Sequence, residues 1–297
     1  MNLDVSIILV NYKTKDLTIN AIKSIKEKTI DIKYEILVVD NNSEDGSVEV
    51  IKQIFPDVNV ISNSSNLGFG TANNVAIKEA KGKYIFCLNT DTLLLNNAIK
   101  LMYNYMEENL NVGVCGGYIY DSEMKPGIAG GMFPSYPQVL LKFDFANLFK
   151  RLKRCYNLSI KSDDEYINNI DYISGANLFV RKTVFNTVGY FDEKIFLYFE
   201  ETDLCKRIKN SGYEVKFLSE AKIVHLEGKS ISSKDGYKKF MCKDSELYYL
   251  KKHYVNSFNI LRGVYLLLYI LDWLILGNKS SKDMFFFVLK WRQGDKN

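Results

Sequence analysis

The stretch EILVVDNNSEDGS, residues 35–47, decides the fold. Its apolar run ends at Val39, and Asp40 opens a polar turn. A run that is apolar at every position is typical of a strand covered on both faces, as in a parallel sheet between helices. Ligands of such sheets bind at the carboxyl ends of the strands, so the residues that follow each run are the first candidates for a binding site.

Three similar runs lie on either side of this stretch, at Ser6–Val10, Val58–Ile61 and Tyr84–Leu88. Between the runs, apolar residues recur at helical spacing: Leu17, Ala21, Ile22 and Ile25; Val48, Ile51 and Ile54; and Ala72, Val75, Ala76 and Ala80, where we expect Gly82 to stop the helix. The resulting βαβαβαβ order predicts an α/β fold with a Rossmann-like, mostly parallel, doubly wound sheet.

The pattern changes between residues 112 and 235. We expect turns and a mobile loop from the glycines at positions 113, 116, 117, 127, 130 and 131. A helix is predicted from Glu200 to Asn210, ending at Gly212, and a strand over Val215–Leu218.

The last sixty residues are apolar and aromatic. Arg262 and Asp272 interrupt Leu261–Gly277, which we therefore expect to be too short to span a membrane, since a spanning helix needs about 20 apolar residues. Met284–Leu289 and Trp291 favour either an interfacial segment or a packed core or dimer helix. We predict a catalytic domain over 1–235, with a nucleotide-binding half (1–110) and an acceptor half (111–235). A helical extension over 236–297 would be membrane-associated or oligomerising.

Composition narrows the function classes. The 297 residues carry a net charge of only +4, so we expect no nucleic-acid partner. The basic run Lys150, Arg151, Lys153 and Arg154 is either a solvated helix face or a patch for a membrane surface or anionic substrate. Five cysteines without CxxC spacing favour reduced thiols, and the N-terminus lacks a signal-peptide pattern. We therefore expect a cytoplasmic protein.

Polar residues follow the predicted strands. Asp40 and its neighbouring amides can bind a base edge and ribose hydroxyls, or simply form a helix-capping turn. Asp91 follows another strand and can hold a divalent ion against a diphosphate, or cap a helix. Between them, the glycines of Asn66–Asn74 permit close approach of an anionic phosphate to a helix N-terminus.

An acidic group, Glu200, Glu201, Thr202 and Asp203, opens the predicted helix at residue 200. The helix dipole favours acids there, and Asp203 can pair with Arg207. The apolar Phe196–Phe199 can instead place one carboxylate in a partly desolvated cleft, which suits a general base. Of the two histidines, His253 belongs to a Lys-rich helix, whereas His225 follows the strand-like Ala221–Val224.

The order of these elements resembles the family 2 glycosyltransferases of the GT-A fold, especially their rhamnosyltransferase-like branch. The matching segments lie between about residues 5 and 230: Val5–Tyr12, Val38–Ser43, Asn66–Gly70, Leu88–Thr92, Ser174–Ala176, Gly189–Glu193, Phe199–Leu204 and His225. So many motifs in family order make a chance match improbable.

The resemblance implies a metal-dependent, inverting transfer from a nucleoside-diphosphate sugar. It assigns Asp91 and His225 to a divalent cation, Mg²⁺ or Mn²⁺. The first acid of the family's DxD motif is replaced by Asn89, so Asp91 must carry most of the metal charge. Glu201 matches the catalytic base, with Glu200 as the alternative and Asp203 in the same group. The implied donor-binding residues are Val10, Asn11, Tyr12, Asp40, Asn42, Asn66, Gly68, Phe69, Gly70, Asn73, Asn89 and Thr90.

The resemblance also implies the substrates. The donor is a dTDP-sugar, such as dTDP-rhamnose, or a UDP-hexose, and the expected acceptor is a growing, lipid-linked glycan of the cell surface. Such an acceptor implies a peripheral protein on the inner face of the cell membrane. The alternative use of the C-terminal extension is the formation of a homodimer. Two alternatives stay open: a nucleotidyltransferase, and a non-catalytic nucleotide-sugar-binding or assembly subunit, which the Asn89 departure does not exclude.

Overall fold

The computed structural model describes residues 3–134, 159–164, 167–226 and 235–292. It divides into two compact units. The first comprises Met1–Met132, Ser159–Phe196 and Glu200–Ser232, and the second comprises Phe133–Leu158, Leu197–Phe199 and Ser233–Asn297. The basic run at 150–154 and Cys155 lie outside the described residues. The division at residue 235 that the sequence suggested stays a prediction.

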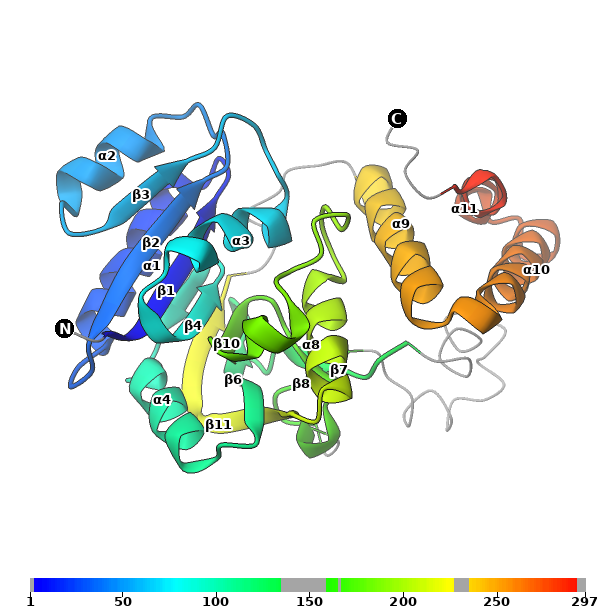
Figure 1. The fold of residues 1–297 in the computed structure, drawn as a ribbon. Coiled ribbons are helices and arrows are strands. Elements are labelled where there is room, and N and C mark those ends of the chain that lie inside the picture. The colour runs from blue at the N-terminus through cyan, green and yellow to red at the C-terminus, as the bar shows by residue number, and fades with distance from the viewer. Residues whose placement is uncertain (1–2, 135–158, 165–166, 227–234, 293–297) are drawn as a thin grey trace. The chain divides into compact units, whose positions relative to one another are not determined.

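The first unit is built on an eight-stranded sheet with the order β3-β2-β1-β4-β10-β6-β11-β5 (Figure 1). Its strands are β1 (Leu3–Asn11), β2 (Tyr34–Asp40), β3 (Asn59–Ser62), β4 (Gly82–Leu88), β5 (Thr92–Leu94), β6 (Val112–Tyr120), β10 (Asn177–Arg181) and β11 (Glu214–His225). Strands β3, β2, β1 and β4 run parallel, as do β6 and β11, whereas β10 and β5 are antiparallel to their neighbours. A small second sheet joins β7 (Ile128–Gly131), β8 (Ile160–Lys161) and β9 (Tyr172–Ile173).

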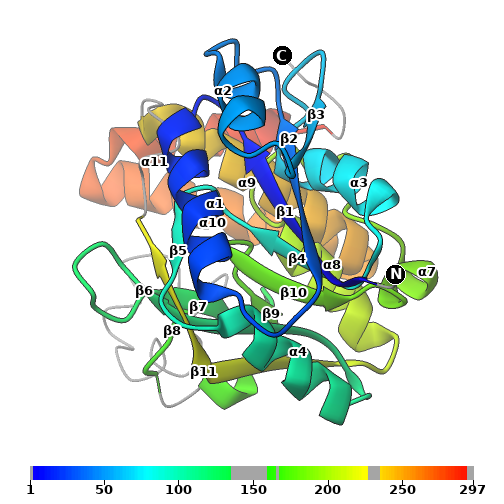
Figure 2. The ribbon, with the colours of Figure 1, turned by 90° about the vertical axis from the view of Figure 1, so that its left-hand side faces the viewer.

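Helices cover both faces of the parallel part of this sheet. The described helices of the unit are α1 (Lys15–Lys28), α2 (Ser47–Ile54), α3 (Phe69–Glu79), α4 (Ala98–Glu108), α7 (Val184–Val188) and α8 (Glu200–Asn210), with a 3₁₀ turn at Ile167–Asn169. Apolar residues of α1, α2 and α4 share one buried core with alternate residues of β1, β2 and β4. In Figure 2, α1 lies over β1 on that face, while α3 contacts β1, β2 and α8.

The sequence predicted the first four strands and three helices in order, and their bounds shift by only a few residues. Two details were wrong. Gly82 does not end a helix, because α3 already ends at Glu79 and Gly82 begins β4. A side chain there would meet the backbone of Ser6, with a Cβ only 2.4 Å from its nitrogen, so glycine permits the two strands to pair.

The glycines after residue 112 also have a different role from the one expected. Gly113, Gly116 and Gly117 lie within β6, and Gly130 and Gly131 lie within β7. A Cβ at Gly116 would lie 2.3 Å from Ile173, and one at Gly117 would lie 2.3 Å from the carbonyl oxygen of Ala221. These glycines therefore allow neighbouring chains to approach closely, rather than forming turns.

Strand register brings the polar strand ends to one edge. Asn11 pairs with Asp40 across β1 and β2, and Leu9 pairs with Leu88 across β1 and β4. The residues that follow β1, β2 and β4 therefore emerge side by side, at the edge where ligands of parallel sheets bind.

The second unit is helical where it is described. It contains α9 (Asp235–His253), a 3₁₀ turn (Val255–Ser257), α10 (Phe258–Leu276) and α11 (Lys279–Lys290). Its buried core joins residues of all three helices with Trp291, which follows α11: Leu247, Tyr249, Leu250, Phe258, Leu261, Tyr265, Tyr269, Met284, Val288 and Trp291.

The apolar segment near residue 261 is longer and more continuous than the sequence indicated. Among the described residues, Val255–Ile275 is long and apolar enough to cross a membrane by length and composition, a test that the core helix of a soluble protein also passes. Arg262 does not interrupt the helix because its guanidinium donates to the carbonyls of Val288 and Leu289. Buried Asp272 likewise accepts hydrogen bonds from other side chains of the unit.

Candidate active site

The ends of β1 and β2 are joined by a buried polar network. The side-chain nitrogen of Asn11 donates to Asp40 at 2.7 Å, to the hydroxyl of Ser43 at 2.9 Å and to that of Ser47 at 2.8 Å. Asp40 also accepts from the Ser43 backbone nitrogen at 3.1 Å and from the Ser47 hydroxyl at 3.2 Å. The carboxylate of Asp40 therefore holds the polar turn after β2 against the end of β1.

The same network reaches the loop after β4. The side-chain oxygen of Asn11 accepts from the hydroxyls of Thr14 at 2.9 Å and Thr18 at 2.8 Å. The Thr14 hydroxyl lies 3.0 Å from that of Thr90. Three strand ends that are distant in the sequence are thus connected by hydrogen bonds.

Asn41 organises the next loop, although the sequence analysis did not choose it as a site residue. Its side chain donates to Asn66 at 2.8 Å and to the Gly68 carbonyl at 3.2 Å, and accepts from the Leu67 backbone at 3.1 Å. The signal that could have found it was its place beside Asp40, at the end of a buried strand.

Gly68 and Gly70, at the start of α3, permit close packing against the segment 191–196. Gly68 has a φ of +81°, and a Cβ there would lie 2.1 Å from the carbonyl oxygen of Phe196. The Phe69 nitrogen donates to this carbonyl at 3.1 Å. A Cβ at Gly70 would lie 3.0 Å from Phe191 and 3.4 Å from the Cβ of Glu200. The start of α3 therefore lies directly against the start of α8.

Asn73 and Asn74, both within α3, differ in their hydrogen bonds. Asn74 forms paired hydrogen bonds with the backbone of Phe191, at 2.9 and 3.0 Å, and fixes that segment. The side-chain nitrogen of buried Asn73 donates to the Phe69 carbonyl at 3.0 Å. The side-chain oxygen of Asn73 has no hydrogen-bond partner within the described residues, so it can accept a bond from a ligand.

Asn89, Asp91 and His225 come together at the ends of β4 and β11. The Nε2 atom of His225 lies 3.1 Å from Asp91 Oδ1 and 3.3 Å from the side-chain nitrogen of Asn89. Pairing of β11 with β5 sets this arrangement, because it places His225 opposite Thr92. The histidine is far from the other two in sequence, and only the sheet brings them together.

Glu200 and Glu201 open α8 with different exposures. Glu200 is buried, and its Oε2 atom has no hydrogen-bond partner in the described part of the chain. Glu201 is partly exposed. A Cβ at Gly175 would lie 3.4 Å from the Phe69 ring and 3.9 Å from the Cβ of Glu201, so these residues are neighbours. The carbonyl of Ala176 accepts from the Asn89 nitrogen at 3.1 Å, which connects this segment to the β4 end.

The surroundings of Glu200 and Glu201 raise the pKa values of both side chains. Burial raises the pKa of Glu201 from 4.5 to about 7, against backbone hydrogen bonds that lower it. Burial, together with the charge of Glu201, raises the pKa of Glu200 well above its ordinary value. The pKa of Glu201 thus lies near neutral pH, where its carboxyl group exchanges a proton readily, which is the property of a general base.

Asp203 differs from both glutamates. It is fully buried, and Arg207 forms an ion pair with it at 2.9 Å. Arg207 also donates to the carbonyls of Gly189 and Tyr190, at 3.2 and 2.8 Å. Of the two sequence interpretations of Asp203, pairing with Arg207 is therefore the one found. This pair fastens α8 to the preceding loop.

The remaining predicted donor-binding residues lie at the edges of the strand ends. Tyr12 is 37% exposed, directly after β1, and Val10 is partly buried. Asn42 adopts a positive φ of +65° in the turn after β2. An exposed ring beside polar side chains offers a surface on which a base can stack.

Comparison with known proteins agrees with this geometry. A family model described as glycosyl transferase family 2 matches residues 6–189, which is more than half of the chain. The N-acetylglucosaminyl-diphospho-decaprenol L-rhamnosyltransferase of Mycobacterium tuberculosis is 27% identical over 215 residues, covering 66% of this chain and 67% of that protein. The low-salt glycan biosynthesis hexosyltransferase Agl10 of Haloferax volcanii is 24% identical over 216 residues, covering 71% and 64%.

A solved structure shows the same fold. The mannosyltransferase PcManGT from Pyrobaculum calidifontis, in complex with GDP-Man and Mn²⁺, aligns with a TM-score of 0.56 and 15% identity, covering 85% of this chain and 64% of that one. The sheet is therefore GT-A-like, with a helical C-terminal extension, as the sequence predicted. The chain spans about two thirds of the length of these relatives.

Proposed function

We propose an activity for this chain from one premise: it belongs to glycosyl transferase family 2. The proposed reaction is an inverting transfer of a sugar from a nucleoside-diphosphate donor to a hydroxyl group of a glycan. Names of relatives include a rhamnosyltransferase and a hexosyltransferase, so a dTDP- or UDP-sugar is the proposed donor class.

The strand-end network is the proposed nucleotide site. Asp40 and Asn11 are fixed by their mutual hydrogen bond, and Tyr12 lies exposed beside them. A base stacked on the Tyr12 ring would meet preorganised polar groups, which reduces the entropy lost on binding. Asn66, Gly68, Phe69, Gly70 and Asn73 would line the donor on the α3 side, together with Asn42, Asn89 and Thr90.

Glu201 is the proposed general base. It would remove the proton from the acceptor hydroxyl while the acceptor oxygen bonds to the anomeric carbon. The bond from that carbon to the diphosphate oxygen breaks in the same step, and the nucleoside diphosphate leaves. One displacement of this kind inverts the anomeric centre. Burial raises the pKa of Glu201 to about 7, so its carboxylate can accept the proton of the hydroxyl group near neutral pH.

The residues after β4 fit a divalent cation. Asp91 offers a carboxylate and His225 an imidazole, a donor set that suits Mn²⁺ better than Mg²⁺, since Mg²⁺ prefers oxygen ligands. In the described residues, no group of three or more His, Cys, Asp or Glu side chains could hold a metal. The phosphates of the donor would complete the ligands of an ion held by Asp91 and His225. When bound, the metal would neutralise charge on the departing diphosphate.

The observation that carries the proposal is that the start of α8 lies beside the segments that border the strand-end site. A carboxyl group with a pKa of about 7 opens α8, and it neighbours the Phe69 and Gly175 segments that border the strand-end site. A non-catalytic sugar-nucleotide subunit would need the nucleotide site but has no need of a base.

A donor panel tests the proposal. The full-length protein is mixed with dTDP-rhamnose, UDP-glucose, UDP-N-acetylglucosamine or GDP-mannose, with and without Mn²⁺, and its melting temperature is measured. At 100 times its Kd, the right donor should stabilise the fold by about 2.7 kcal/mol. Slow release of nucleoside diphosphate should follow. Release of pyrophosphate from a nucleoside triphosphate and a sugar phosphate would instead indicate a nucleotidyltransferase. Binding without any turnover, with acceptor added, would favour a non-catalytic subunit.

We also propose that the second unit contacts the inner surface of the cell membrane. Apolar residues on α10 are strongly exposed: Ile260 (63%), Leu267 (56%), Leu274 (67%) and Ile275 (61%). The Nζ of Lys282 lies 5.2 Å from the centre of the Trp273 ring. Exposed apolar residues with aromatic and basic neighbours are typical of interfacial helices. A homodimer that covers the same face is the alternative.

Flotation with anionic liposomes distinguishes a membrane-contacting face of α10 from a subunit interface. The variant Leu267→Glu/Leu274→Glu should stop the protein from floating, while Ile30→Glu/Leu110→Glu, at residues that are 59% and 70% exposed in the first unit, should not. If the wild type does not float and the α10 variant changes the molar mass in solution, the face is a subunit interface and the membrane proposal is wrong.

A further inference from the structure

Three residues of the second unit directly precede the proposed base. Leu197–Phe199 belongs to the second unit, whereas the residues on either side, up to Phe196 and from Glu200, belong to the first. Glu200 is the first residue of α8, and Glu201 is the second. The conformation of this short segment therefore decides how the chain enters the helix that carries the base.

The backbone of the segment is strained. Tyr198 and Phe199 have φ values of +68° and +70°, in the left-handed region that bulky residues rarely adopt. We refer to these two residues as the kink. Glycine adopts such φ values freely, but it occupies neither position. Strain of this kind persists only where neighbouring contacts impose it, and it is common at functional sites.

The second unit holds the segment through two contacts with α9. The hydroxyl of Ser245 donates to the Leu197 carbonyl at 2.8 Å. The Phe199 ring packs against the buried core of the unit, with its centre 5.6 Å from that of the Tyr249 ring. Ser245 and Tyr249 are both buried and lie one turn apart on α9, so a single face of this helix supplies both contacts.

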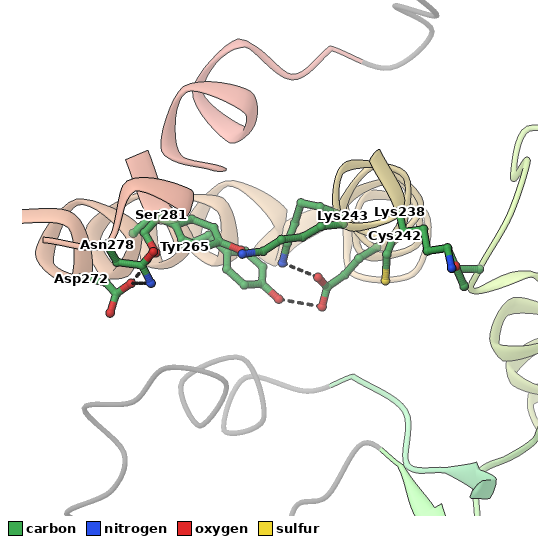
Figure 3. A pocket seen from close by; sticks show the side chains of 11 residues that line it. Lys238, Cys242, Lys243, Tyr265, Asp272, Asn278 and Ser281 are labelled. Carbon is green, nitrogen blue, oxygen red and sulfur yellow. Dashed lines mark hydrogen bonds and ion pairs between the residues drawn. The ribbon is translucent and has the colours of Figure 1, made fainter. Parts of the chain in front are cut away.

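Tyr198 borders a cavity of the same unit. The cavity has a volume of about 560 Å³, and its other walls come from α9, α10 and the start of α11 (Figure 3). In these walls Glu246 accepts hydrogen bonds from Lys243 and from the hydroxyl of Tyr265, shown as dashed lines in Figure 3. The bond with Tyr265 joins α9 to α10 directly after Ser245, so the helix that holds the kink is itself fixed.

The chain just before the segment is held as well, within the first unit. The Phe196 carbonyl accepts a hydrogen bond from the Phe69 nitrogen at 3.1 Å. Gly68 permits this approach, because a Cβ there would lie 2.1 Å from the same carbonyl oxygen. The kink therefore lies between a fixed carbonyl and the first turn of α8. A change of φ in the kink must be taken up by that turn.

The first turn of α8 sets the surroundings of the Glu201 carboxyl group. Burial raises its pKa to about 7, whereas hydrogen bonds from the backbone of Glu201 and Thr202 lower it. Its charge acts on Glu200 and Cys205 of the same helix. Each of these influences depends on the direction in which the side chain of Glu201 leaves the helix. A rotated first turn would increase the exposure of the carboxylate to water.

We propose that α9 positions the base: through Ser245 and Tyr249 it holds the kink in the conformation that directs Glu201 toward the acceptor. Ser245 and Tyr249 are positioning residues, since they act through the kink and not on the substrate. The role of Glu201 as the base rests on the proposed function, whereas the hold of α9 on the Glu201 side chain does not. The second unit thereby takes part in the transfer itself.

Ser245→Ala in the full-length protein tests the inference by donor hydrolysis, in which water is the acceptor. The assay measures release of nucleoside diphosphate from dTDP-rhamnose, or from whichever sugar nucleotide of the donor panel binds. The variant should lower kcat by about tenfold or more and leave the donor Kd unchanged, because it misplaces the base and not the donor.

Ser211→Ala is the matched control. The Ser211 hydroxyl donates to the Ile208 carbonyl, also at 2.8 Å, but at the other end of α8. The control should keep kcat within about twofold of the wild type, because the first turn of the helix is unchanged. Equal losses in the two variants, or no loss in Ser245→Ala, would overturn the inference.

The ¹³C NMR signal of the Glu201 carboxyl carbon tests the hold of α9 without any turnover. Its absence in Glu201→Gln assigns it. The wild-type signal should titrate with a pKa of about 7, and in Ser245→Ala the pKa should fall toward 4.5 because the carboxylate gains contact with water. An unchanged titration in Ser245→Ala would refute the positioning role. If the pKa falls but the wild type shows no turnover, the proposed function is wrong and the positioning of Glu201 stands.

Two substitutions at Tyr198 test the kink itself. Proline fixes φ at about −65° and cannot adopt the observed +68°, whereas glycine adopts it without strain. Both variants lose the same ring. Tyr198→Pro should therefore lower kcat at least about tenfold more than Tyr198→Gly. Equal kcat values in the two variants would overturn the inference. If the proline variant does not fold, the titration of Ser245→Ala decides.

Discussion

The carboxylate of Asp40 and those of Glu200 and Glu201, all in the first unit, have opposite surroundings. Asp40 accepts hydrogen bonds from the side chains of Asn11 and Ser47 and from the backbone of Ser43. Glu200 has one oxygen without a hydrogen-bond partner among the described residues, and Glu201 beside it has a pKa raised to about 7 by burial. The carboxylate of Asp40 is fixed by hydrogen bonds, whereas burial raises the pKa values of Glu200 and Glu201. A carboxyl group thus stabilises the fold at Asp40, whereas at Glu201 it is suited to proton transfer.

The largest effect is expected at a third carboxylate, that of the proposed metal ligand Asp91. Asp91→Ala should reduce transfer to the assay background and abolish the effect of Mn²⁺ on donor binding, because neighbouring Asn89 supplies no charge. Steady-state kinetics and donor titrations with and without Mn²⁺ measure both. Wild-type turnover in the variant, or full activity of the wild type in EDTA, would contradict the metal proposal.

The second largest effect is expected from removal of the proposed base, Glu201. Glu201→Gln should lower kcat by about 10²-fold or more and leave donor affinity unchanged, because the amide keeps the shape but accepts no proton. Glu79→Gln, at an exposed position at the end of α3, is the matched control. A variant with normal kcat and a weakened donor Kd would mean that Glu201 binds the donor instead.

Replacement of Asp40 should lower the stability of the fold, in contrast to replacement of Glu201. Asp40→Asn should lower the free energy of unfolding by about 1–3 kcal/mol, since it disrupts a buried, charge-assisted hydrogen-bond network. Urea unfolding measures this change. Asp57→Asn removes an exposed ion pair with Lys26 and should cost about 0–1 kcal/mol. Equal stability of Asp40→Asn and the wild type would remove the distinction between the two groups.

The smallest effect is expected at Glu200. Burial raises the pKa of Glu200 and so favours its neutral form, which an amide resembles; Glu200→Gln should therefore lower kcat by less than about tenfold. Thermal unfolding should show no loss of stability. If this variant loses more activity than Glu201→Gln, the base was assigned one residue too late.

Much of this arrangement could be predicted from the sequence. The apolar runs gave the order of the first strands, and the polar residues after them gave the site edge, because parallel strands end together. The bounds of α8 were also predicted, since Glu200 and Gly212 carry ordinary helix-end signals.

The remaining features depend on tertiary contacts. The glycines of β6 resemble turn residues until Ile173 and Ala221 are seen against them. Arg262 and Asp272 seem to break an apolar helix only while their partners are unknown. The difference between Asp40 and Glu200 arises from neighbours far away in the chain, which no local pattern records.

The pH dependence of kcat/KM, for wild type and Glu201→Gln, tests the central claim most directly. The base works only when deprotonated, so wild-type kcat/KM should fall as pH decreases through about 7 and level off above it. The residual activity of Glu201→Gln should lack this acid limb. A limb near pH 7 that persists unchanged in the variant would show that another group titrates, and would contradict the assignment of Glu201 as the base.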